Sequence, residues 1–533
     1  MNKIKNIAVF IALFLAITVF LINVVFIANV YNGWEEKVTI SYFGILNLLI
    51  SFVASIAIII LTNFVDKKIK QGNIVISKNK KLIILFIIFI IYAIIQMIWV
   101  YIRNSAPIAD SMSVYEAAKQ LSKGEDIFNP YYFEFNPQNL TLAYMFSIIF
   151  KLLHSSNLII LKYLNIIANC FIMIGLILIA KELKKDYKIN MPLFIILAFT
   201  YIPIILLVNF VYGDLIGFAF TIFSIYFIIR YSRKRKIKYL FISSLLMALA
   251  IILRMNYMIF AIAIIIYLML NLLEAKRKNI KVISLQLILI LAFIIISLFP
   301  ANILKHIVGS QYNVDTSKEF PTTRYIAMGM QEGPRANGWY NSTGDMGFEE
   351  IVPSSTYEKM IKERLVEFTK DIPYTIKFYI KKIASMWAEP LQESIWQNLS
   401  FNFGLYKGET EKDVAQVEEW KKVDEGLLKI EGYVKIYQKV LLFIIFGGIV
   451  CFILKNRKNI SNEALLLLIC FVGGFMFHIM WEGKSRYIIP YIIILTPLSC
   501  ISLDILDNIK KIKEKIVKNV IKTKTRLKGE DYG

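Results

Sequence analysis

The apolar stretch LIILFIIFIIYAIIQMIWVYI (82–102), with RNSAPIADSMSVYEAAKQLSKGEDIFNP (103–130) directly after it, decides the fold of this chain. A run of this length crosses a bilayer as a helix, because about 20 apolar residues span the hydrocarbon core. Asp110 follows soon after the run ends. The two segments therefore predict a membrane-spanning helix that delivers a carboxylate to the membrane surface.

Apolar runs of similar length recur along the 533 residues, of which 57% are hydrophobic. A water-soluble protein cannot bury so much apolar surface, so the composition predicts an all-α polytopic membrane protein. The first run is too long for the core of a signal peptide and lacks a small-residue cleavage site, so we interpret it as a retained span. Twelve spans are predicted, at residues 7–30, 41–64, 82–102, 158–180, 191–208, 215–231, 239–253, 257–273, 282–299, 436–454, 462–480 and 487–506.

The net charge of +22 is concentrated in basic clusters between the apolar runs. Lys and Arg are enriched in the cytoplasmic loops of membrane proteins, so the clusters predict a cytoplasmic face with both termini on it. They orient the chain in the cell membrane and attract anionic lipid, and they give no indication of nucleic-acid binding. The clusters are residues 65–81, 181–188, 230–238, 276–281, 455–458 and 510–528.

The order of spans and loops divides the chain into four regions. Residues 1–81 hold two N-terminal spans and a basic cytoplasmic loop, and residues 82–300 hold a transmembrane core. Within that core, the first external loop (103–157) is expected to carry juxtamembrane helices, because its second apolar stretch is too short to span comfortably. Residues 301–435 are expected to form a small external segment without a sheet, and residues 436–533 the last three spans and a basic cytoplasmic tail.

Two acids and three bases fall at the ends of predicted spans on the external face, namely Asp110, Asp214, Arg254, Lys484 and Arg486. Helix capping is an alternative role for each aspartate. Arg254 lies between apolar runs, where a guanidinium is costly unless it is paired or snorkels to the interface. Lys484 and Arg486 run against the positive-inside bias, which favours a local function for both.

This set of charges suits the transfer of a sugar from a polyprenyl phosphate. Such a reaction needs a carboxylate to take the proton from an acceptor hydroxyl, and cations to hold the leaving phosphate. Asp110 is then the catalytic base, and Asp214 is a second catalytic carboxylate that orients the base or holds a divalent cation, Mg²⁺ or Mn²⁺. Arg254, Lys484 and Arg486 bind the donor phosphate.

Five motifs follow one another along the chain: ADSMSVYEAAKQLSKGEDIF (109–128), NPQNLTLAYMFSIIFKLL (136–153), VYGDLIG (211–217), ALAIILRMNYMIF (248–260) and EGKSRYIIPY (482–491). In this order they resemble the GT-C superfamily of integral-membrane glycosyltransferases, and the chain is similar to bacterial protein O-mannosyltransferases and aminoarabinose transferases. The resemblance implies a GT-C-type fold, a catalytic Asp110, a second acid at Asp214 and a phosphate contact at Arg254. The two N-terminal spans precede the part of the chain that it covers.

The resulting hypothesis is an inverting glycosyltransferase that moves a sugar from a polyprenyl-phosphate donor to an acceptor hydroxyl outside the cytoplasm. A cell-wall polymer, a glycolipid or a protein could supply that hydroxyl. Two alternatives stay open: a polymerase or ligase of lipid-linked oligosaccharides, and a flippase or transporter without a covalent step. Transporters usually place ionisable residues at mid-membrane, whereas the predicted spans here are almost free of charge in mid-bilayer.

Four further residues are candidates for the pocket that holds the sugar or the acceptor. Tyr115 and Glu116 follow the proposed base along the chain, and His478 and Glu482 lie near the last basic motif. A packed polar side chain is the alternative for His478. For Glu482 we expect an ion pair with Lys484 or Arg486.

Overall fold

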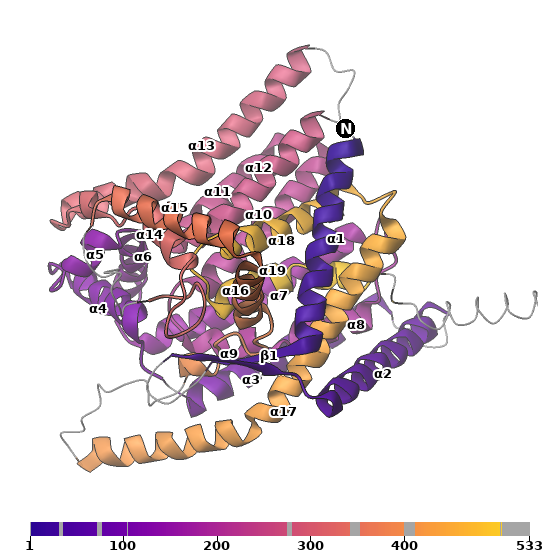
Figure 1. Cartoon of the computed structure of the whole chain (residues 1–533), viewed down its shortest axis with the longest axis horizontal. Coiled ribbons are helices and arrows are strands. Elements are labelled where there is room, and N and C mark those ends of the chain that lie inside the picture. The colour runs from indigo at the N-terminus through magenta and orange to yellow at the C-terminus, as the bar shows by residue number, and fades with distance from the viewer. Residues whose placement is uncertain are drawn as a thin grey trace, which may run out of the picture.

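The computed structural model describes residues 2–30, 36–71, 77–103, 105–273, 280–341, 352–398, 411–501 and 503. Within them, nine helices are long and apolar enough to cross a membrane, which agrees with a polytopic helical fold. The long helices pack side by side into one bundle (Figure 1). They are α1 (Asn2–Val25), α2 (Ile45–Lys70), α3 (Lys78–Ile102), α7 (Leu158–Leu183), α10 (Asp214–Lys234), α12 (Met258–Leu273), α13 (Ile280–Gln311), α17 (Glu411–Asn456) and α18 (Asn462–Met480).

Three of the twelve predicted spans are not single long helices. The span predicted at 191–208 is bent by 44° after α8 (Met191–Phe199), at the start of α9 (Ile202–Leu206). Pro203 lies in the first turn of α9 and has no backbone N–H with which to continue the hydrogen bonds of α8. The span predicted at 239–253 is α11 (Ile237–Leu253), an apolar helix of 17 residues.

The span predicted at 487–506 is also wrong as a continuous helix over its described part. It consists of a 3₁₀ turn (Ser485–Ile488), α19 (Ile489–Ile493) and α20 (Thr496–Ser499). Each of the two α-helices has a proline in its first turn, and a proline cannot donate the hydrogen bond that would join the pieces. The segment nevertheless passes through the interior of the bundle, since residues 491–501 are all buried.

A β-hairpin stands between the first two helices, where residues 31–40 fall between two predicted spans and the sequence predicted no strand. β1 (Phe26–Val30) and β2 (Val38–Tyr42) pair antiparallel. The first predicted span extended to residue 30 and the second began at residue 41, so both were assigned too much of this region. β-branched and aromatic residues make up much of both strands and favour them over helix.

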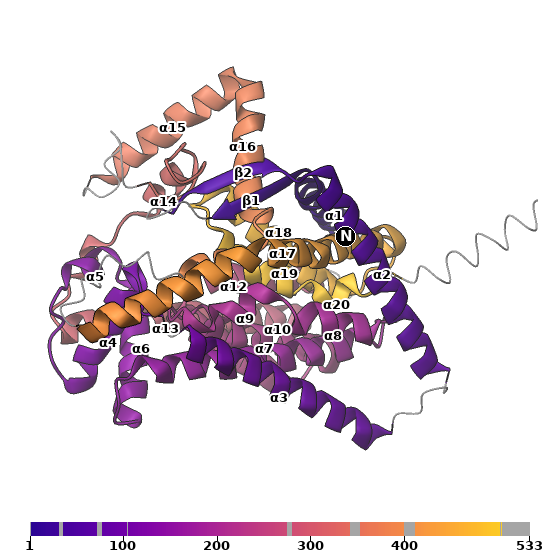
Figure 2. The same ribbon diagram turned by 90° about the horizontal axis from the view of Figure 1, so that it is seen from below.

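The hairpin is attached to the region that follows α13. The backbone N–H of Ala28 donates to the carbonyl of Ala388 at 3.1 Å, directly after α16 (Ile372–Trp387). Figure 2 shows the two strands together with α15 (Ser354–Lys370) and α16 along one side of the bundle. The N-terminal helices are therefore joined to the external segment as well as to the other spans.

The predicted boundaries of the external segment do not coincide with helix ends. α13 continues through Pro300 to Gln311, so the segment expected to begin at 301 starts inside a helix. α14 (Thr322–Gly329) follows, and α17 runs unbroken through residue 435 into its apolar half. Between 301 and 435, the described residues contain helices and irregular chain without a strand, as expected.

The segment predicted as the first external loop (103–157) folds as a layer of three helices at one side of the bundle. They are α4 (Ala109–Lys123), α5 (Tyr131–Phe135) and α6 (Gln138–Leu152). In both views α4, α5 and α6 lie together at one side of the bundle (Figures 1 and 2). The apolar side of α4, which includes Val114 and Leu121, is fully buried and fixes the start of α4 against the bundle.

Basic segments predicted to be cytoplasmic meet at the opposite end of the bundle. Glu182 at the end of α7 pairs with Arg230 at 3.3 Å, and Arg233 pairs with Glu463 at 3.4 Å. Lys5 donates to the side chain of Asn462 at 3.0 Å. The basic residues 276–279 and 510–528 lie outside the described part of the chain.

Candidate active site

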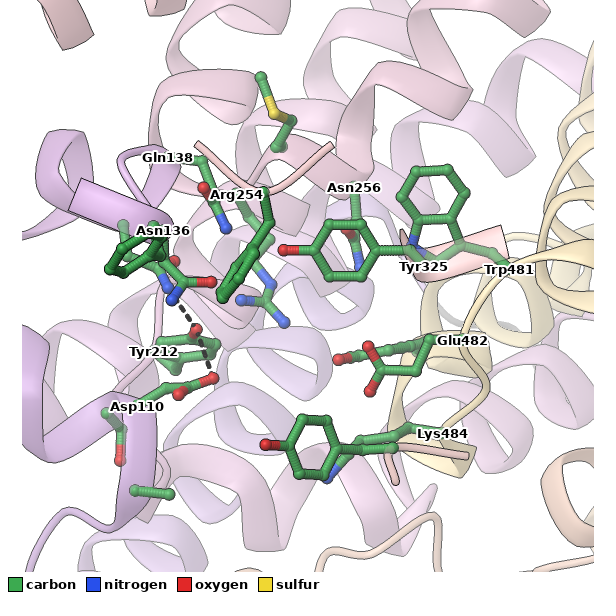
Figure 3. A pocket seen from close by; sticks show the side chains of 18 of the residues that line it. Asp110, Asn136, Gln138, Tyr212, Arg254, Asn256, Tyr325, Trp481, Glu482 and Lys484 are labelled. Atoms are coloured by element: carbon green, nitrogen blue, oxygen red, sulfur yellow. Dashed lines mark hydrogen bonds between the residues drawn. The ribbon is translucent and has the colours of Figure 1, made fainter. Parts of the chain in front are cut away.

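A cavity of about 1600 Å³ lies where α11 and α18 end. The start of α4, the turn before α10, the start of α12, the chain around α14 and the loop after α18 line it. Figure 3 shows Asp110 and Lys484 on facing walls. Four of the five charged residues predicted for the site line this cavity, namely Asp110, Arg254, Lys484 and Arg486.

Asp110 points into the cavity and does not cap its helix. The hydroxyl of Ser111 accepts from the N–H of Ile108 at 2.8 Å and donates to its carbonyl at 2.6 Å, so Ser111 closes the first turn of α4. The alternative role of Asp110 as a cap is therefore wrong. Its Oδ2 accepts a hydrogen bond of 3.1 Å from the hydroxyl of Tyr212. Ala109 has a positive φ of 42°, a conformation that is rare for a non-glycine residue and typical of functional sites.

Tyr212 connects the carboxylate with the cations. Its hydroxyl accepts a hydrogen bond of 2.9 Å from Asn139, and the guanidinium of Arg254 lies 4.2 Å from the centre of its ring. Gly213 follows with a φ of 78°, and a Cβ on it would meet the carbonyl oxygen of Leu253 at 2.6 Å. The VYGD turn thus packs directly against the end of α11, which places Tyr212 beside Arg254.

Arg254 and Arg486 form the basic centre of the site. Their guanidinium groups lie 5.7 and 5.3 Å from the centre of the same ring, that of Tyr487, and Arg486 also lies 4.5 Å from the ring of Phe210. Among the described residues, Nε of Arg254 and both Nε and Nη1 of Arg486 have no hydrogen-bond partner, although all three atoms are buried. Nε of Arg254 and Nε of Arg486 each face one carboxylate, at 3.4 and 3.9 Å, and Nη1 of Arg486 remains as a buried donor that an anionic ligand would satisfy.

Asp214 lies behind Arg254 and outside the lining of the large cavity. Its Oδ1 is 3.4 Å from Nε of Arg254, so the carboxylate pairs with the guanidinium. The divalent cation considered at Asp214 does not fit this arrangement. Its carboxylate faces a positive charge, and the described residues contain no group of three or more His, Cys, Asp or Glu that could hold a metal ion.

Lys484 is not a free cation. Its Nζ donates to both carboxylate oxygens of Glu36, at 2.8 and 3.0 Å, and Arg335 donates to one of the same oxygens. Burial would raise the pKa of Glu36, but the positive charges of Lys484 and Arg335 outweigh burial and lower it. No local sequence pattern indicates Glu36 or Arg335, because each becomes part of the site through contacts with residues far away in the chain.

Glu482 makes no ion pair with the described residues, so its expected pairing with Lys484 or Arg486 is wrong. Those two side chains pair with Glu36 and Glu393 instead. The side chain of Glu482 lines the cavity, where burial raises its pKa and the nearby carboxylates of Asp110 and Glu36 add to this effect.

An aromatic wall adjoins Glu482. Tyr325 of α14 and Trp481 stack with ring centroids 5.3 Å apart and an angle of 8° between the planes, and both line the cavity (Figure 3). Flat aromatic surfaces of this kind suit the apolar face of a sugar ring. Their partnership could not be predicted, since Tyr325 and Trp481 belong to different regions of the chain.

Three predicted pocket residues lie elsewhere. Tyr115 donates to the carbonyl of Ser156 at 3.0 Å, and Glu116 is exposed and pairs with Lys119 at 3.0 Å. Neither lines the cavity, because each residue of a helix turns the side-chain direction by about 100° and these two face away from the side of Asp110. His478 is buried behind the site against the ring of Tyr487, at a centroid distance of 5.6 Å, which agrees with the alternative of a packed polar residue.

A protein-family model described as "conserved hypothetical integral membrane protein" matches residues 1–504. The chain belongs to this family and is an integral membrane protein. The match includes both N-terminal helices, the hairpin between them and every residue of the cavity. Curated proteins show no match to the chain.

Proposed function

We propose that the chain is an inverting glycosyltransferase that transfers a sugar from a polyprenyl-phosphate donor to an acceptor hydroxyl. The observation that carries the proposal is the grouping of Asp110, Tyr212, Arg254 and Arg486 in one cavity, with a carboxylate on one side of Tyr212 and guanidinium groups on the other. A base and an anion-binding centre within reach of one ligand are what this reaction requires.

The reaction proceeds as a single displacement. The acceptor oxygen forms a bond to the anomeric carbon while the bond from that carbon to the phosphate oxygen breaks, and the bonding electrons leave with the phosphate. The carboxylate of Asp110 takes the proton of the attacking hydroxyl, and Tyr212 holds the carboxylate by its hydrogen bond. Because attack and departure occur on opposite faces of the carbon, the anomeric configuration inverts.

The arginines receive the charge that develops on the leaving phosphate. Nη1 of Arg486 is buried without a hydrogen-bond partner among the described residues, so a phosphate oxygen can accept from it without displacing another acceptor, whereas Nε of Arg254 faces Asp214. Charge-assisted hydrogen bonds of this type are about twice as strong as neutral ones. Asp214 acts as a positioning residue that fixes the guanidinium of Arg254 from behind.

The same arrangement supports a specific orientation in the cell membrane. The cavity and the arginine-rich cluster around Glu182 lie at opposite ends of the bundle. If that cluster is cytoplasmic by the positive-inside rule, the cavity faces the extracytoplasmic side, where wall polymers, glycolipids and proteins offer hydroxyl groups.

A second candidate is a polymerase or ligase that uses a lipid-linked oligosaccharide. A volume of about 1600 Å³ exceeds the range of about 300–1000 Å³ of ordinary small-molecule sites, so the cavity has room for several sugar units. The chemistry at the anomeric carbon would be the same. No observation favours the flippase alternative in the same way, because lipid translocation needs no base and would leave Asp110 without a role.

The test is a transfer assay in proteoliposomes with polyprenyl-phosphate sugars labelled in the sugar. The proposal predicts label in the acceptor and release of unlabelled polyprenyl phosphate in equal amounts. Label that stays on intact donor lipid, or that merely changes leaflet, would contradict glycosyl transfer. A parallel series with oligosaccharide donors distinguishes the first candidate from the second.

A further inference from the structure

We propose that Lys484 and Arg335 form a second anion-binding subsite, which Glu36 holds together, for a phosphate group other than the one on Arg254 and Arg486. This inference rests on the proposed glycosyl-transfer function and extends it within the same cavity. It also gives the N-terminal hairpin, which lies outside the motifs of the glycosyltransferase resemblance, a part in the site.

The three side chains converge on one atom. Oε2 of Glu36 accepts from Nζ of Lys484 at 3.0 Å and also from Nη1 of Arg335. Two cationic nitrogens bonded to the same oxygen are necessarily close together, at a spacing that two oxygens of one phosphate can bridge. All three residues line the cavity, and Figure 3 shows Lys484 on the wall opposite Asp110.

Glu36 lies behind the two cations. Its side chain is 6% exposed, whereas those of Lys484 and Arg335 are 13% and 29% exposed. The carboxylate is therefore the anchor, and the cations are the groups that a ligand reaches first. Lys484 uses two of its three N–H donors on Glu36, and Arg335 has five donors of which one bonds to Glu36, so donors remain for a ligand.

The backbone around the subsite is tied together at two further points. The N–H of Val38 in β2 donates to the carbonyl of Arg335 at 2.9 Å, and the N–H of Gly483 donates to the carbonyl of Gly338 at 2.7 Å. Gly338 has a φ of 70°, and a Cβ on it would lie 2.5 Å from a backbone oxygen, so only glycine fits there. Three parts of the chain that are distant in sequence, around Val38, Arg335 and Gly483, are thus hydrogen-bonded together at this wall of the cavity.

The charge of the subsite favours an anion. Two positive side chains and one carboxylate leave an excess of one positive charge, and the ring of Tyr340 lies 4.9 Å from the guanidinium of Arg335. A phosphate is the matching chemistry, because a guanidinium and an ammonium together offer several donors to its oxygens. Two sources could supply this phosphate: the second phosphate of a diphosphate-linked donor, or a phosphate carried by the acceptor.

Binding of inorganic phosphate to the whole chain in nanodiscs, followed by ³¹P NMR, tests the subsite. We expect two phosphate ions per wild-type chain and one per chain in Arg335→Met. In Glu36→Gln the affinity of one ion should fall about tenfold, about 1.4 kcal/mol, since the two cations are no longer held together. The control is Glu134→Gln, which removes the 2.8 Å ion pair with Lys318 outside the cavity lining and should bind two ions as the wild type does.

Wild-type stoichiometry and affinity in both Arg335→Met and Glu36→Gln would overturn the subsite. Tighter binding in Glu36→Gln would overturn the anchoring role, because Glu36 would then compete with the ligand. A purely structural role predicts that Glu36→Gln and Lys484→Met weaken binding independently. The proposal predicts that the double variant binds no more weakly than Lys484→Met alone and that Glu36→Asp restores part of the affinity.

Kinetics then identify the source of the phosphate. If it belongs to the donor, Arg335→Met raises KM about tenfold for a diphosphate-linked donor and leaves KM for a monophosphate-linked donor unchanged. If it belongs to the acceptor, only the KM of a phosphate-bearing acceptor rises. An unchanged KM for all of these substrates would contradict the subsite. Should the wild type transfer no sugar at all, the proposed function fails, and the phosphate stoichiometry still decides whether the subsite exists.

Discussion

Arginines occur at both ends of the helix bundle, but the number of carboxylates around them differs. Arg233, at the end with the basic clusters, lies near three carboxylates: those of Asp186, Glu182 and Glu463. Arg254 and Arg486, at the cavity, have one carboxylate each although their side chains are more deeply buried, at 10% and 8% exposure against 19% for Arg233. At one end three carboxylates surround one arginine, whereas at the cavity each arginine has a single carboxylate.

This difference separates structural from functional charge. A buried cation without sufficient counter-charge costs folding free energy, so its presence beside a cavity favours a ligand that supplies the missing acceptor. The aromatic rings of Tyr212 and Tyr487 hold the two guanidinium groups in place without using up their N–H donors. Matched substitutions at the two ends of the bundle test this difference.

The largest expected effect belongs to Asp110→Asn, which keeps the shape of the side chain and removes the base. Turnover of the donor should fall about 10³-fold, as is typical for loss of a general base. Asp186→Asn at the other end removes a carboxylate that pairs with Arg233 and should leave turnover unchanged. Transfer rates of the two variants in proteoliposomes check the prediction, and equal rates would contradict it.

The next effect concerns the cations. Arg254→Met and Arg486→Met should each lower kcat/KM about 10²-fold, because each removes donors aimed at charge on the leaving phosphate. Arg233→Met should instead lower the melting temperature and spare kcat/KM, since Arg233 serves only the fold. The comparison would fail if Arg233→Met impaired catalysis as strongly as the two cavity variants.

A smaller effect is expected for Tyr212→Phe, which deletes the 3.1 Å hydrogen bond to Asp110 and keeps the ring under Arg254. One such hydrogen bond contributes about 1 kcal/mol, so kcat should fall between about fivefold and tenfold. Tyr267→Phe is the matched control, because its hydroxyl bonds to Ser232 far from the cavity lining. Unchanged kcat in Tyr212→Phe would remove Tyr212 from the mechanism.

The smallest effect is one of stability. Burial raises the pKa of Glu482 above its ordinary value of 4.5, so ionisation of this side chain at neutral pH destabilises the folded state. Glu482→Gln should therefore raise the melting temperature by a few degrees at pH 7 to 8. The difference should shrink as the pH falls and vanish well below 4.5, where the glutamate is protonated in both folded and unfolded chains. A lower melting temperature of the variant at neutral pH would show that Glu482 is stabilised by a partner.

The sequence predicted the framework of this site because hydrophobicity and charge are local signals. Apolar runs located the long helices, and the order of spans and basic clusters put Asp110, Arg254 and Arg486 at the same end of the bundle, where one cavity contains them. The sequence does not predict the hairpin, because β1 continues the apolar run of α1, and length and hydropathy assign both to one span.

The remaining site residues depend on tertiary contacts that no local pattern encodes. Glu36 meets Lys484 across 448 positions and Arg335 across 299. The sequence pattern points to the charged Asp214 and not to Tyr212 two positions before it, but the carboxylate of Asp214 turns toward Arg254 and away from the cavity. Tyr115 and Glu116 were predicted in the pocket because they follow Asp110 closely in sequence. The turn of the helix points both side chains away from the cavity.

The anomeric configuration of the product, determined by NMR with a donor of known configuration, distinguishes a single displacement from a mechanism with a covalent intermediate. If Asp110 deprotonates the acceptor while Arg254 and Arg486 hold the leaving phosphate, the product has the opposite configuration to the donor, and one polyprenyl phosphate is released per sugar transferred. A product with retained configuration would require a covalent sugar–enzyme intermediate, and would contradict the role of Asp110 as a base in a single displacement.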